Sequence, residues 1–415
     1  MSTQRPGRAA ITGIGVIAPN GLRTDAYWKS VREGLSVLDR ITREGCTDMP
    51  LQVAGEVRAF DASALIEDKF LVQTDRFSHF AMAAAALALD DAGLGGGNPA
   101  EPFSVGVVTA AGSGGGEFGQ RELQKLWGQG SKFVGPYQSI AWFYAASTGQ
   151  ISIRGGFKGP CGVVASDEAG GLDSLAHAAR AVRRGTGTMI VGAAEAPLAP
   201  YSMVCQLGYP ELSTVAEPDR AYRPFTSSAC GFVPAEGGAL LVVEDEERAR
   251  ERGAEVRAVL AGHAATFTGA SRWADSREGL ARAIRGALDE AGCAPEEIDV
   301  VFADAMGVPE ADRAEALAIA DALGAHGRRV PVTAPKTGFG RAYCGAPVLD
   351  TVAAVLAMEH GQVPPTPNVF DTCHDLDLVM ERARPAELRT ALVLSRGLMG
   401  SNAALVVRRG GESAR

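Results

Sequence analysis

The chain has 415 residues, of which 46% are hydrophobic and 6% aromatic, and its formal net charge is −9. This length and apolar content suffice for a large buried core, and the acidic balance argues against a nucleic-acid-binding surface. The longest purely apolar run, residues 80–89, is far shorter than the roughly 20 residues of a membrane-spanning helix. The opening segment MSTQRPGRAA has no apolar signal core, so we expect a cytoplasmic protein without a membrane partner.

Short β-branched segments alternate with alanine-rich helical segments along the first half of the chain. The predicted strands are Ala9–Val16, Ser104–Ala110, Gly162–Ala165, Thr188–Gly192 and Ala239–Glu244. The predicted helices are Phe77–Ala92, Arg121–Trp127 and Gly170–Arg184. Strands that alternate with helices indicate mostly parallel sheets covered by helices, which is an α/β fold.

The second half of the chain repeats this pattern. Its predicted strands are Glu255–Ala261, Asp299–Ala303, Val330–Ala334, Ala391–Arg396 and Ala403–Arg408. Its predicted helices are Arg277–Ala291, Glu310–Leu323 and Pro347–His360. We therefore expect a duplicated α/β unit with two packed halves, residues 1–250 and 251–415.

Neither metal-binding nor dinucleotide-binding motifs are supported by the spacing of residues. The seven cysteines and six histidines form no CxxC, HxxxH or HExxH pattern, so we expect no metal and no bound cofactor. Gly114, Gly116 and Gly119 match a dinucleotide fingerprint, but no acidic residue ends a second strand about 20 positions later. A tight turn with close backbone packing explains these glycines better.

The segment VVASDEAGGLDS, residues 163–174, has a carboxylate where many enzymes have a nucleophile. An apolar pair leads into a small polar turn with Asp167 and Glu168, and a helical segment follows. A helix N-terminus offers free N–H groups and a positive dipole end, which suit a nucleophile at such a corner. A second loop, residues 332–350, places Lys336 and Arg341 between a core strand and a buried helix, where a cation is expected to be paired or functional.

Several longer segments carry a family resemblance that spans nearly the whole chain. ITGIGVIAPNG, DRFSHFAMAAAALALDDAGL, RPFTSSACGFVPAEGGALLV and GLMGSNAALVV resemble the β-ketoacyl synthases of the thiolase fold. EFGQRELQKLW, AWFYAASTGQISIR, AGGLDS and FADAMGVPEADRAEA more closely resemble the chain length factor, or ketosynthase β, of bacterial type II polyketide synthases. The resemblance implies two five-stranded sheets in αβαβα layers and a heterodimer with a catalytic ketosynthase α.

The same resemblance implies a degenerate catalytic site. An active ketosynthase has a cysteine thiolate at the corner and two histidines that assist decarboxylation. These three positions map to Glu168, Asp304 and Arg341, so no residue of the catalytic types remains. The resemblance also implies a structural ion pair between Glu315 and Lys336. It further places a gate position, filled by Phe in the family, at Leu398.

Glu168 departs from the chain-length-factor pattern, because the usual residue at this corner is Gln. A buried Glu needs a partner or a proton, and Arg341 is the natural partner, with Asp304 as its competitor. In one interpretation Glu168 is a structural replacement in a site without chemistry. In the other, it promotes malonyl decarboxylation or priming.

The family places its chain-length determinants on the helix after GGGEF. They map to Gly116, Gly119 and Leu123, whose spacing puts them on one helical face, and a bulky tunnel position maps to Tyr201. The family often has aromatic residues at the positions of Gly116 and Leu123. This face is therefore unusually small here, which predicts a long product.

These observations predict a non-catalytic subunit that pairs with a ketosynthase α and sets how far a poly-β-ketone intermediate grows from malonyl units. An acidic acyl carrier protein would dock mainly on the partner, since this chain is itself acidic. One alternative is a thiolase-fold scaffold or a priming subunit that does not set product length. An independently active condensing enzyme of fatty-acid type would require the missing cysteine and histidines.

Overall fold

The structure is a computed structural model that describes residues 7–95, 99–269 and 272–411. Within these residues the main sheet has eleven strands in the order β12-β10-β9-β14-β15-β8-β1-β7-β6-β4-β5. Its strands are β1 (Ala9–Ile17), β4 (Val105–Ala110), β5 (Cys161–Val164), β6 (Thr188–Glu195), β7 (Gly237–Asp245), β8 (Ala258–Phe267), β9 (Val300–Phe302), β10 (Pro331–Thr333), β12 (Asp377–Leu378), β14 (Thr390–Arg396) and β15 (Ser401–Arg409). Two small sheets pair β2 (Asp39–Arg40) with β3 (Val53–Ala54) and β11 (Gln362–Val363) with β13 (Arg384–Pro385).

The strand directions differ from the mostly parallel arrangement that the sequence predicted. β4 runs parallel to β5 and β6, and β9 runs parallel to β10 and β14. Between these outer groups, the neighbours from β6 through β7, β1, β8 and β15 to β14 are antiparallel. The prediction is wrong there because some connections lack a helical crossover. A four-residue turn joins β14 to β15, and so short a connection allows only antiparallel pairing.

Two five-stranded groups meet at the middle of this sheet. β1 pairs with β8 over three residue pairs, Ala9–Leu260, Ala10–Val259 and Ile11–Ala258. On one side lie β1, β7, β6, β4 and β5, and on the other lie β8, β15, β14, β9 and β10, with the short β12 at the edge. The expected pair of five-stranded sheets is thus joined into one by a short contact.

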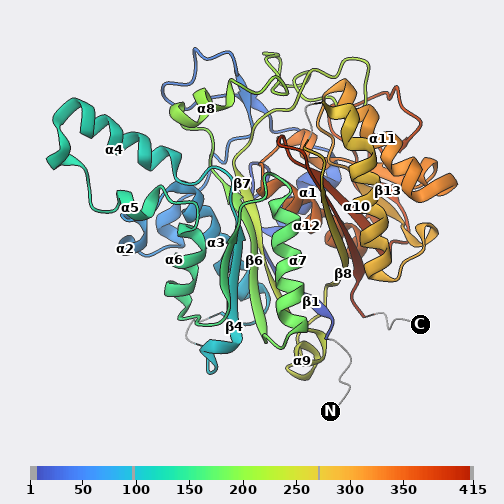
Figure 1. Cartoon of the computed structure of the whole chain (residues 1–415), viewed down its shortest axis with the longest axis horizontal. Helices are drawn as coiled ribbons and strands as arrows, with labels where there is room; N and C mark the ends of the chain where they lie inside the picture. The colour runs from blue at the N-terminus through green and yellow to red at the C-terminus, as the bar shows by residue number, and fades with distance from the viewer. Residues whose placement is uncertain (1–6, 96–98, 270–271, 412–415) are drawn as a thin grey trace.

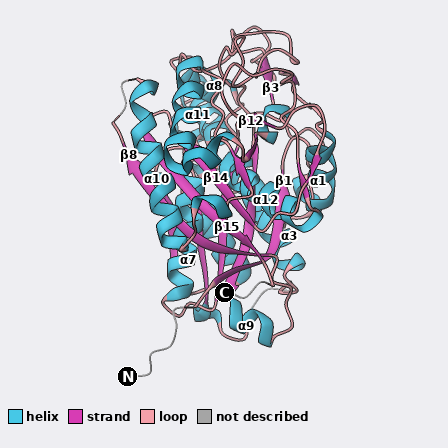
Figure 2. Cartoon of the chain, turned by 90° about the vertical axis from the view of Figure 1, so that its right-hand side faces the viewer, coloured by secondary structure: helices cyan, strands magenta, loops and turns pink. Residues whose placement is uncertain are grey.

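The helices form layers on both sides of each strand group. They are α1 (Thr24–Glu33), α2 (Asp68–Leu71), α3 (Arg76–Asp91), α4 (Gly116–Gln129), α5 (Gln138–Ala141), α6 (Ala146–Gly155), α7 (Gly170–Arg183), α8 (Pro200–Gln206), α9 (Glu246–Glu251), α10 (Ser276–Ala291), α11 (Pro309–Leu323) and α12 (Gly345–His360). α3 and α6 cover one strand group, and α10 covers the other with α11 packed beside it. α7 and α12 contact strands of both groups and form the central layer of an αβαβα sandwich (Figures 1 and 2).

The central layer contains the largest hydrophobic core. α12 is buried from Gly345 to Met358, and its apolar side chains pack with those of α7 and of both strand groups. A helix that is apolar on all sides needs such burial on every face. This layer fixes the positions of the loops that precede α7 and α12.

One part of the first half projects from the body of the molecule. Figure 1 shows α4 extending away from the sheet, with α5 returning below it. The sequence predicted a helix at Arg121–Trp127, whereas α4 begins five residues earlier, at Gly116. Among the residues that the structure describes, no helix is both long enough and apolar enough to span a bilayer.

Helix α3 lies unusually close to β1, which gives a first test of the packing. A Cβ atom added to Gly15 would clash with the carbonyl oxygen of Ala84, within α3. We expect Gly15→Ala to lower the free energy of unfolding by about 1–3 kcal/mol, since overpacking forces the backbone apart. Chemical denaturation measures this change.

Gly128 supplies the matched control, because a Cβ atom there would meet nothing within 4 Å. Gly128→Ala should leave stability unchanged or raise it by up to about 1 kcal/mol, since alanine is the better helix former. Equal effects of the two substitutions would contradict the packing described for α3 and β1.

Candidate functional site

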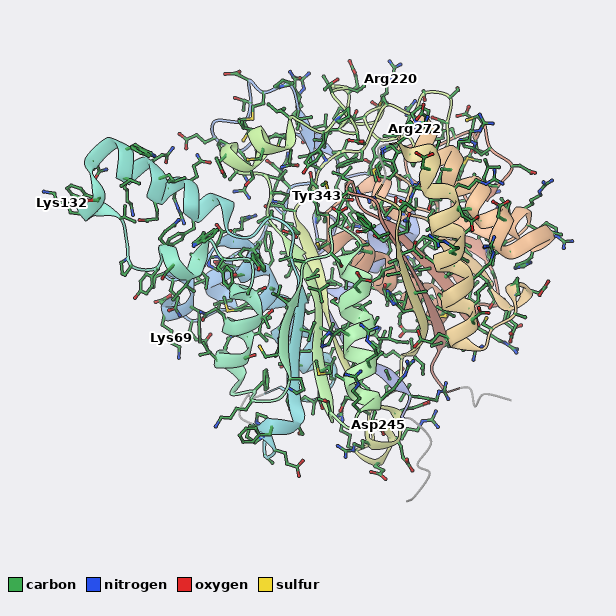
Figure 3. All side chains as sticks on the ribbon, viewed as in Figure 1. Lys69, Lys132, Arg220, Asp245, Arg272 and Tyr343 are labelled. Carbon is green, nitrogen blue, oxygen red and sulfur yellow. The ribbon has the colours of Figure 1, made fainter. Side chains whose placement is uncertain are left out.

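A cavity of 380 Å³ lies at the carboxyl ends of the parallel strands β4, β5 and β6. Ligands commonly bind at this edge of an α/β sheet. Figure 3 shows Tyr343, one of its wall residues, above the upper ends of the central strands. The wall consists of Ala111, Gly112, Ser113, Gly116, Ala165, Asp167, Glu168, Pro197, Tyr201, Ser202, Cys205, Gln206, Tyr209, Tyr343, Cys344 and Leu398.

Glu168 lies at the predicted corner between β5 and α7. β5 ends at Val164, α7 begins at Gly170, and Asp167 has a positive φ of 57° that turns the chain sharply. The Glu168 side chain is buried, with 3% of the residue exposed. The loop thus presents this carboxyl group to the cavity beside the first turn of a central-layer helix.

Arg341 bridges Glu168 and Asp304, as the sequence suggested. Its Nε donates to Oε2 of Glu168 at 2.8 Å, and an NH2 nitrogen lies 2.6 Å from the same oxygen. The NH2 group also donates to Oδ1 of Asp304 at 2.8 Å, and the NH1 group donates to the Asp304 carbonyl oxygen at 3.0 Å. The three degenerate positions therefore form one buried ion cluster, because a single guanidinium serves both carboxylates.

Arg396 extends this cluster, and the sequence analysis missed it. It is fully buried at the end of β14, where its Nε donates to Oδ2 of Asp304 at 3.1 Å and its NH2 group to Oε2 of Glu315 at 2.8 Å. A lone arginine in the apolar strand ALVLSR was the available signal, since an unpaired charge is almost never fully buried.

The predicted ion pair between Glu315 and Lys336 is wrong in its partners. Lys336 pairs with Asp350 of α12 at 2.5 Å, and Glu315 pairs with Arg396. Both residues instead hold the chain after β9: Lys336 donates to the carbonyl oxygens of Ala303 and Asp304, and Glu315 accepts from the N–H groups of Asp304 and Ala305. The family resemblance showed only that positions 315 and 336 are charged, and it did not reveal that Arg396 and Asp350 are their partners.

Burial and the neighbouring charges set the protonation of the cluster. Burial raises the pKa of Glu168 to about 7, against the lowering effect of Arg341. Burial also acts to raise the pKa of Asp304, but Arg341 and Arg396 outweigh it and hold that pKa below its usual range. No described residue hydrogen-bonds to Oε1 of Glu168, so this buried oxygen has no hydrogen-bonding partner within the cluster.

The cavity offers no activated nucleophile. The Cys344 thiol, just before α12, is the buried thiol of the wall, and it donates to the Asp167 carbonyl oxygen at 3.1 Å. Burial, followed by the field of Glu195, raises the pKa of this thiol well above its usual value, so the reactive thiolate is disfavoured. Cys161 is exposed on β5 and is absent from the wall. Cys205 on α8 is exposed and lines the wall, but no described lysine, arginine or histidine side chain lines the wall with it to favour a thiolate. None of the described histidines belongs to the wall.

Of the five positions assigned to the tunnel and the gate, three line the cavity and two lie outside it. Gly116, Tyr201 and Leu398 line the cavity. Gly119 is buried outside it, where a Cβ atom would meet Trp142 at 3.7 Å, and Leu123 is partly exposed farther along α4. Their common helical face therefore begins in the cavity and continues outside it along the projecting helix.

Glu195 and Gln206 shape the wall and were not singled out from the sequence. Glu195 is fully buried at the end of β6 and accepts hydrogen bonds from Gly112 N and Ser113 Oγ. Gln206 accepts a hydrogen bond from the Tyr343 hydroxyl and donates to the Pro197 carbonyl oxygen. An acid at the end of an apolar strand was the signal for Glu195.

The wall of the cavity has acidic side chains and no basic side chain among the described residues. Its charged members are Asp167 and Glu168, and no described lysine, arginine or histidine side chain lines it. Within the described residues, no cluster of His, Cys, Asp or Glu side chains is suited to hold a metal ion. The cavity therefore suits a neutral occupant better than an anionic one.

Comparisons with known proteins agree with these features. Two family models match the chain: Beta-ketoacyl synthase, N-terminal domain, at residues 7–249, and Beta-ketoacyl synthase, C-terminal domain, at residues 257–370. The chain is 77% identical to the "Putative polyketide beta-ketoacyl synthase 2" of Streptomyces cyaneus, over 98% of this chain and 97% of that protein. It is 49% identical to the "Tetracenomycin polyketide synthase ketoacyl synthase beta subunit" of Streptomyces glaucescens, over 98% and 99%. The structure titled "The ishigamide ketosynthase/chain length factor" matches with a TM-score of 0.89 at 29% identity, over 98% of this chain and 100% of that one.

The raised pKa of Glu168 predicts a pH-dependent stability. Between the ordinary value of 4.5 and about 7, the folded state keeps a proton that the unfolded state releases. The free energy of unfolding should therefore fall as pH rises through this window, and Glu168 should contribute about 1–3 kcal/mol of that fall. Glu168→Gln removes this contribution, so denaturation curves should show the variant gaining stability relative to the wild type from pH 4.5 to 7.

The exposed Glu217 provides the control, since Glu217→Gln should keep the wild-type dependence on pH. A constant stability difference between Glu168→Gln and the wild type across this window would contradict a raised pKa at Glu168.

Proposed function

The chain belongs to the β-ketoacyl synthase family, and we propose that within it this protein is a non-catalytic chain-length-determining subunit. It pairs with a ketosynthase α, and the pair builds a poly-β-ketone from malonyl units carried on an acyl carrier protein. The observation that carries this proposal is the Glu168–Arg341–Asp304 cluster, which fills the place of a cysteine and two histidines.

The ion cluster leaves no residue for the condensation steps. A carboxylate does not form a durable thioester, and Arg341 cannot act as a base because its guanidinium stays protonated. Arg341 is also fully buried and donates to Glu168 and Asp304. The nucleophile and the decarboxylation machinery must therefore come from the partner, which excludes an independent condensing enzyme of fatty-acid type.

The charge of the cavity disfavours the alternative of a priming subunit. Malonyl decarboxylation requires a site that accepts a carboxylate, and the wall here has two acidic side chains, Asp167 and Glu168, and no cationic side chain among the described residues. Arg341 lies behind Glu168, where its donors already have partners. A growing poly-β-ketone is uncharged along its length and fits this wall better.

A scaffold that does not shape the product is disfavoured by Gly116. This residue lines the cavity at the first turn of α4 and contributes no side chain to it. Its φ lies outside the left-handed region, so the backbone conformation does not require glycine there. The small residue leaves room in the cavity, which supports a role in setting the space for the growing chain.

The partner surface in this proposal is the projecting region of α4 and α5 together with the free edge of β5. β5 ends the strand order and pairs only with β4 among the described strands. Large exposed apolar side chains gather in this region: Leu123, Trp127, Phe133, Tyr137, Trp142, Phe143 and Tyr144. Exposed aromatic patches and open sheet edges are both typical of protein interfaces.

Two further expectations from the sequence belong to the proposal. The halves 1–250 and 251–415 would be two copies of one ancestral unit, each supplying a strand group and its covering helices. The pair would work in the cytoplasm, with the carrier protein docked mainly on the ketosynthase α.

The central test is co-expression with the ketosynthase α, followed by the mass of the product. We expect Gly116→Phe to shorten the polyketide, because a ring would occupy space that the chain otherwise fills. A Cβ atom at Gly116 would clash with the hydroxyl oxygen of Ser202, so the substitution is combined with Ser202→Ala.

Ser202→Ala alone is the control and should leave product length unchanged. Circular dichroism and co-purification establish that the double variant folds and assembles. A folded, assembled double variant that makes a product of unchanged length would refute the assignment of Gly116 to the chain-length wall.

The assembly is tested at Trp127, which is 83% exposed on α4. We expect Trp127→Glu to weaken the one-to-one heterodimer by about 2 kcal/mol or more, since aromatic anchors dominate interface energies. Analytical ultracentrifugation measures this change. Phe370, exposed by 65% in the other half of the chain, supplies the control Phe370→Glu. Equal affinities for the two variants would place the partner elsewhere.

A further inference from the structure

Asp167 makes contacts that the proposed function does not use. Its Oδ2 accepts a hydrogen bond from the backbone N–H of Met399 at 2.7 Å. Its φ of 57° is left-handed, a conformation that Asp and Asn tolerate better than most other residues with side chains. The corner before α7 is thereby tied to a turn that is far away in the sequence.

That turn, residues 397–400, joins β14 to β15. Gly400 N donates to the Gly397 carbonyl oxygen at 3.1 Å, and Gly397 N donates to the Ser401 carbonyl oxygen at 2.9 Å. The side chain of Met399 is exposed, whereas Leu398 is partly buried and lines the cavity. The Asp167 bond therefore holds the tip of the turn that carries Leu398 inward.

Gly397 is matched to the Asp167 side chain. A Cβ atom added to Gly397 would clash with the Asp167 carboxylate. The φ of Gly397 is outside the left-handed region, so its conformation alone does not require glycine. Glycine is needed at this position because the carboxylate lies against it.

Leu398 lies between two cavities. Besides the 380 Å³ cavity, it lines a smaller one of 60 Å³ whose wall includes Trp273 and Asn402. The side chain packs against the same hydrophobic cluster as Tyr343 and Trp273. Because Leu398 lines both cavities, a displacement of the turn would change the wall of each.

We propose that Asp167 is a positioning residue that latches the 397–400 turn through Met399 N–H and so holds Leu398 as the wall between the two cavities. The part of this inference that rests on the proposed function is the assignment of the larger cavity to the growing chain. The latch itself is a property of the folded chain, so it can be measured without turnover.

Two substitutions separate the hydrogen bond from the backbone conformation. Asp167→Asn keeps an acceptor oxygen and a side chain that tolerates the positive φ, whereas Asp167→Gly removes the acceptor and leaves the backbone unstrained. The full chain is co-purified with its ketosynthase partner. Hydrogen exchange is followed at residues 397–400, and the rate of Cys344 alkylation by N-ethylmaleimide is measured by peptide mass spectrometry.

We expect exchange at Met399 and alkylation of Cys344 to be roughly tenfold faster in Asp167→Gly, the scale of one charge-assisted hydrogen bond. Asp167→Asn should stay within about twofold of the wild type, since its amide oxygen can still accept the bond. The exposed Cys373, which lines neither cavity, is the internal control, and its alkylation should be the same in all three proteins. Wild-type rates in Asp167→Gly, or equal acceleration in Asp167→Asn, would overturn the latch.

Gly397→Ala tests the match from the other side. Alone it should destabilise the turn, and combined with Asp167→Gly it should melt no lower than Asp167→Gly, because the clash has been removed. Additive losses would contradict the matched contact. An accelerated Asp167→Gly that still makes a product of unchanged length would refute the assignment of Leu398 to the chain's wall, while leaving the latch and the rest of the proposed function standing.

Discussion

The guanidinium of Arg341 is the group on which the degenerate site depends. It is fully buried, and its N–H groups donate to the carboxylates of Glu168 and Asp304. They also donate to the backbone carbonyl oxygens of Asp304 and Arg396. A buried cation without such partners would be strongly destabilising, and the two carboxylates would be equally costly without the cation. One residue thus joins the corner before α7, the chain after β9 and the end of β14. These are the places to which the family resemblance assigns the nucleophile, the first histidine and the gate.

Under the proposed function, this arrangement means that the loss of chemistry involves more than the absence of a cysteine at the corner. The corner still turns sharply at Asp167 and still lies at the start of a central-layer helix. However, the positions that the resemblance assigns to both assisting histidines belong to the ion cluster, and Cys344, the buried thiol of the cavity wall, is disfavoured as a thiolate by burial and by Glu195. The fold has kept the geometry of a nucleophile site while its electrostatics stabilise a closed ion network.

The sequence predicted the layered fold and the identity of the cluster because both follow from local patterns and a family resemblance. Alternating strands and helices located the main elements, and motif order brought Glu168, Asp304 and Arg341 together. It did not predict the antiparallel middle of the sheet, because a strand reads alike in either direction and a short turn decides the pairing. The sequence also predicted the wrong partner for Lys336. Its ion pair with Asp350 depends on distances in the folded chain, which a motif does not encode. Arg396 and the Met399 contact of Asp167 are likewise long-range, since their partners are separated by 81 to 232 residues.

The charge balance of the cluster bears on Glu168, which stands where the family resemblance leads us to expect Gln. Three cations, Arg341, Arg396 and Lys336, face four carboxyl groups, those of Glu168, Asp304, Glu315 and Asp350. A buried network approaches neutrality when one carboxyl group keeps a proton. Burial raises the pKa of Glu168 to about 7, and its Oε1 lacks a hydrogen-bonding partner among the described residues, so this group can hold the proton near neutral pH. A protonated Glu has nearly the shape of Gln and, like it, offers both a donor and an acceptor. At neutral pH, Glu168 therefore differs from a Gln at this position mainly in having a proton that can be released. The geometry around Arg341 is compatible with Glu or Gln at position 168.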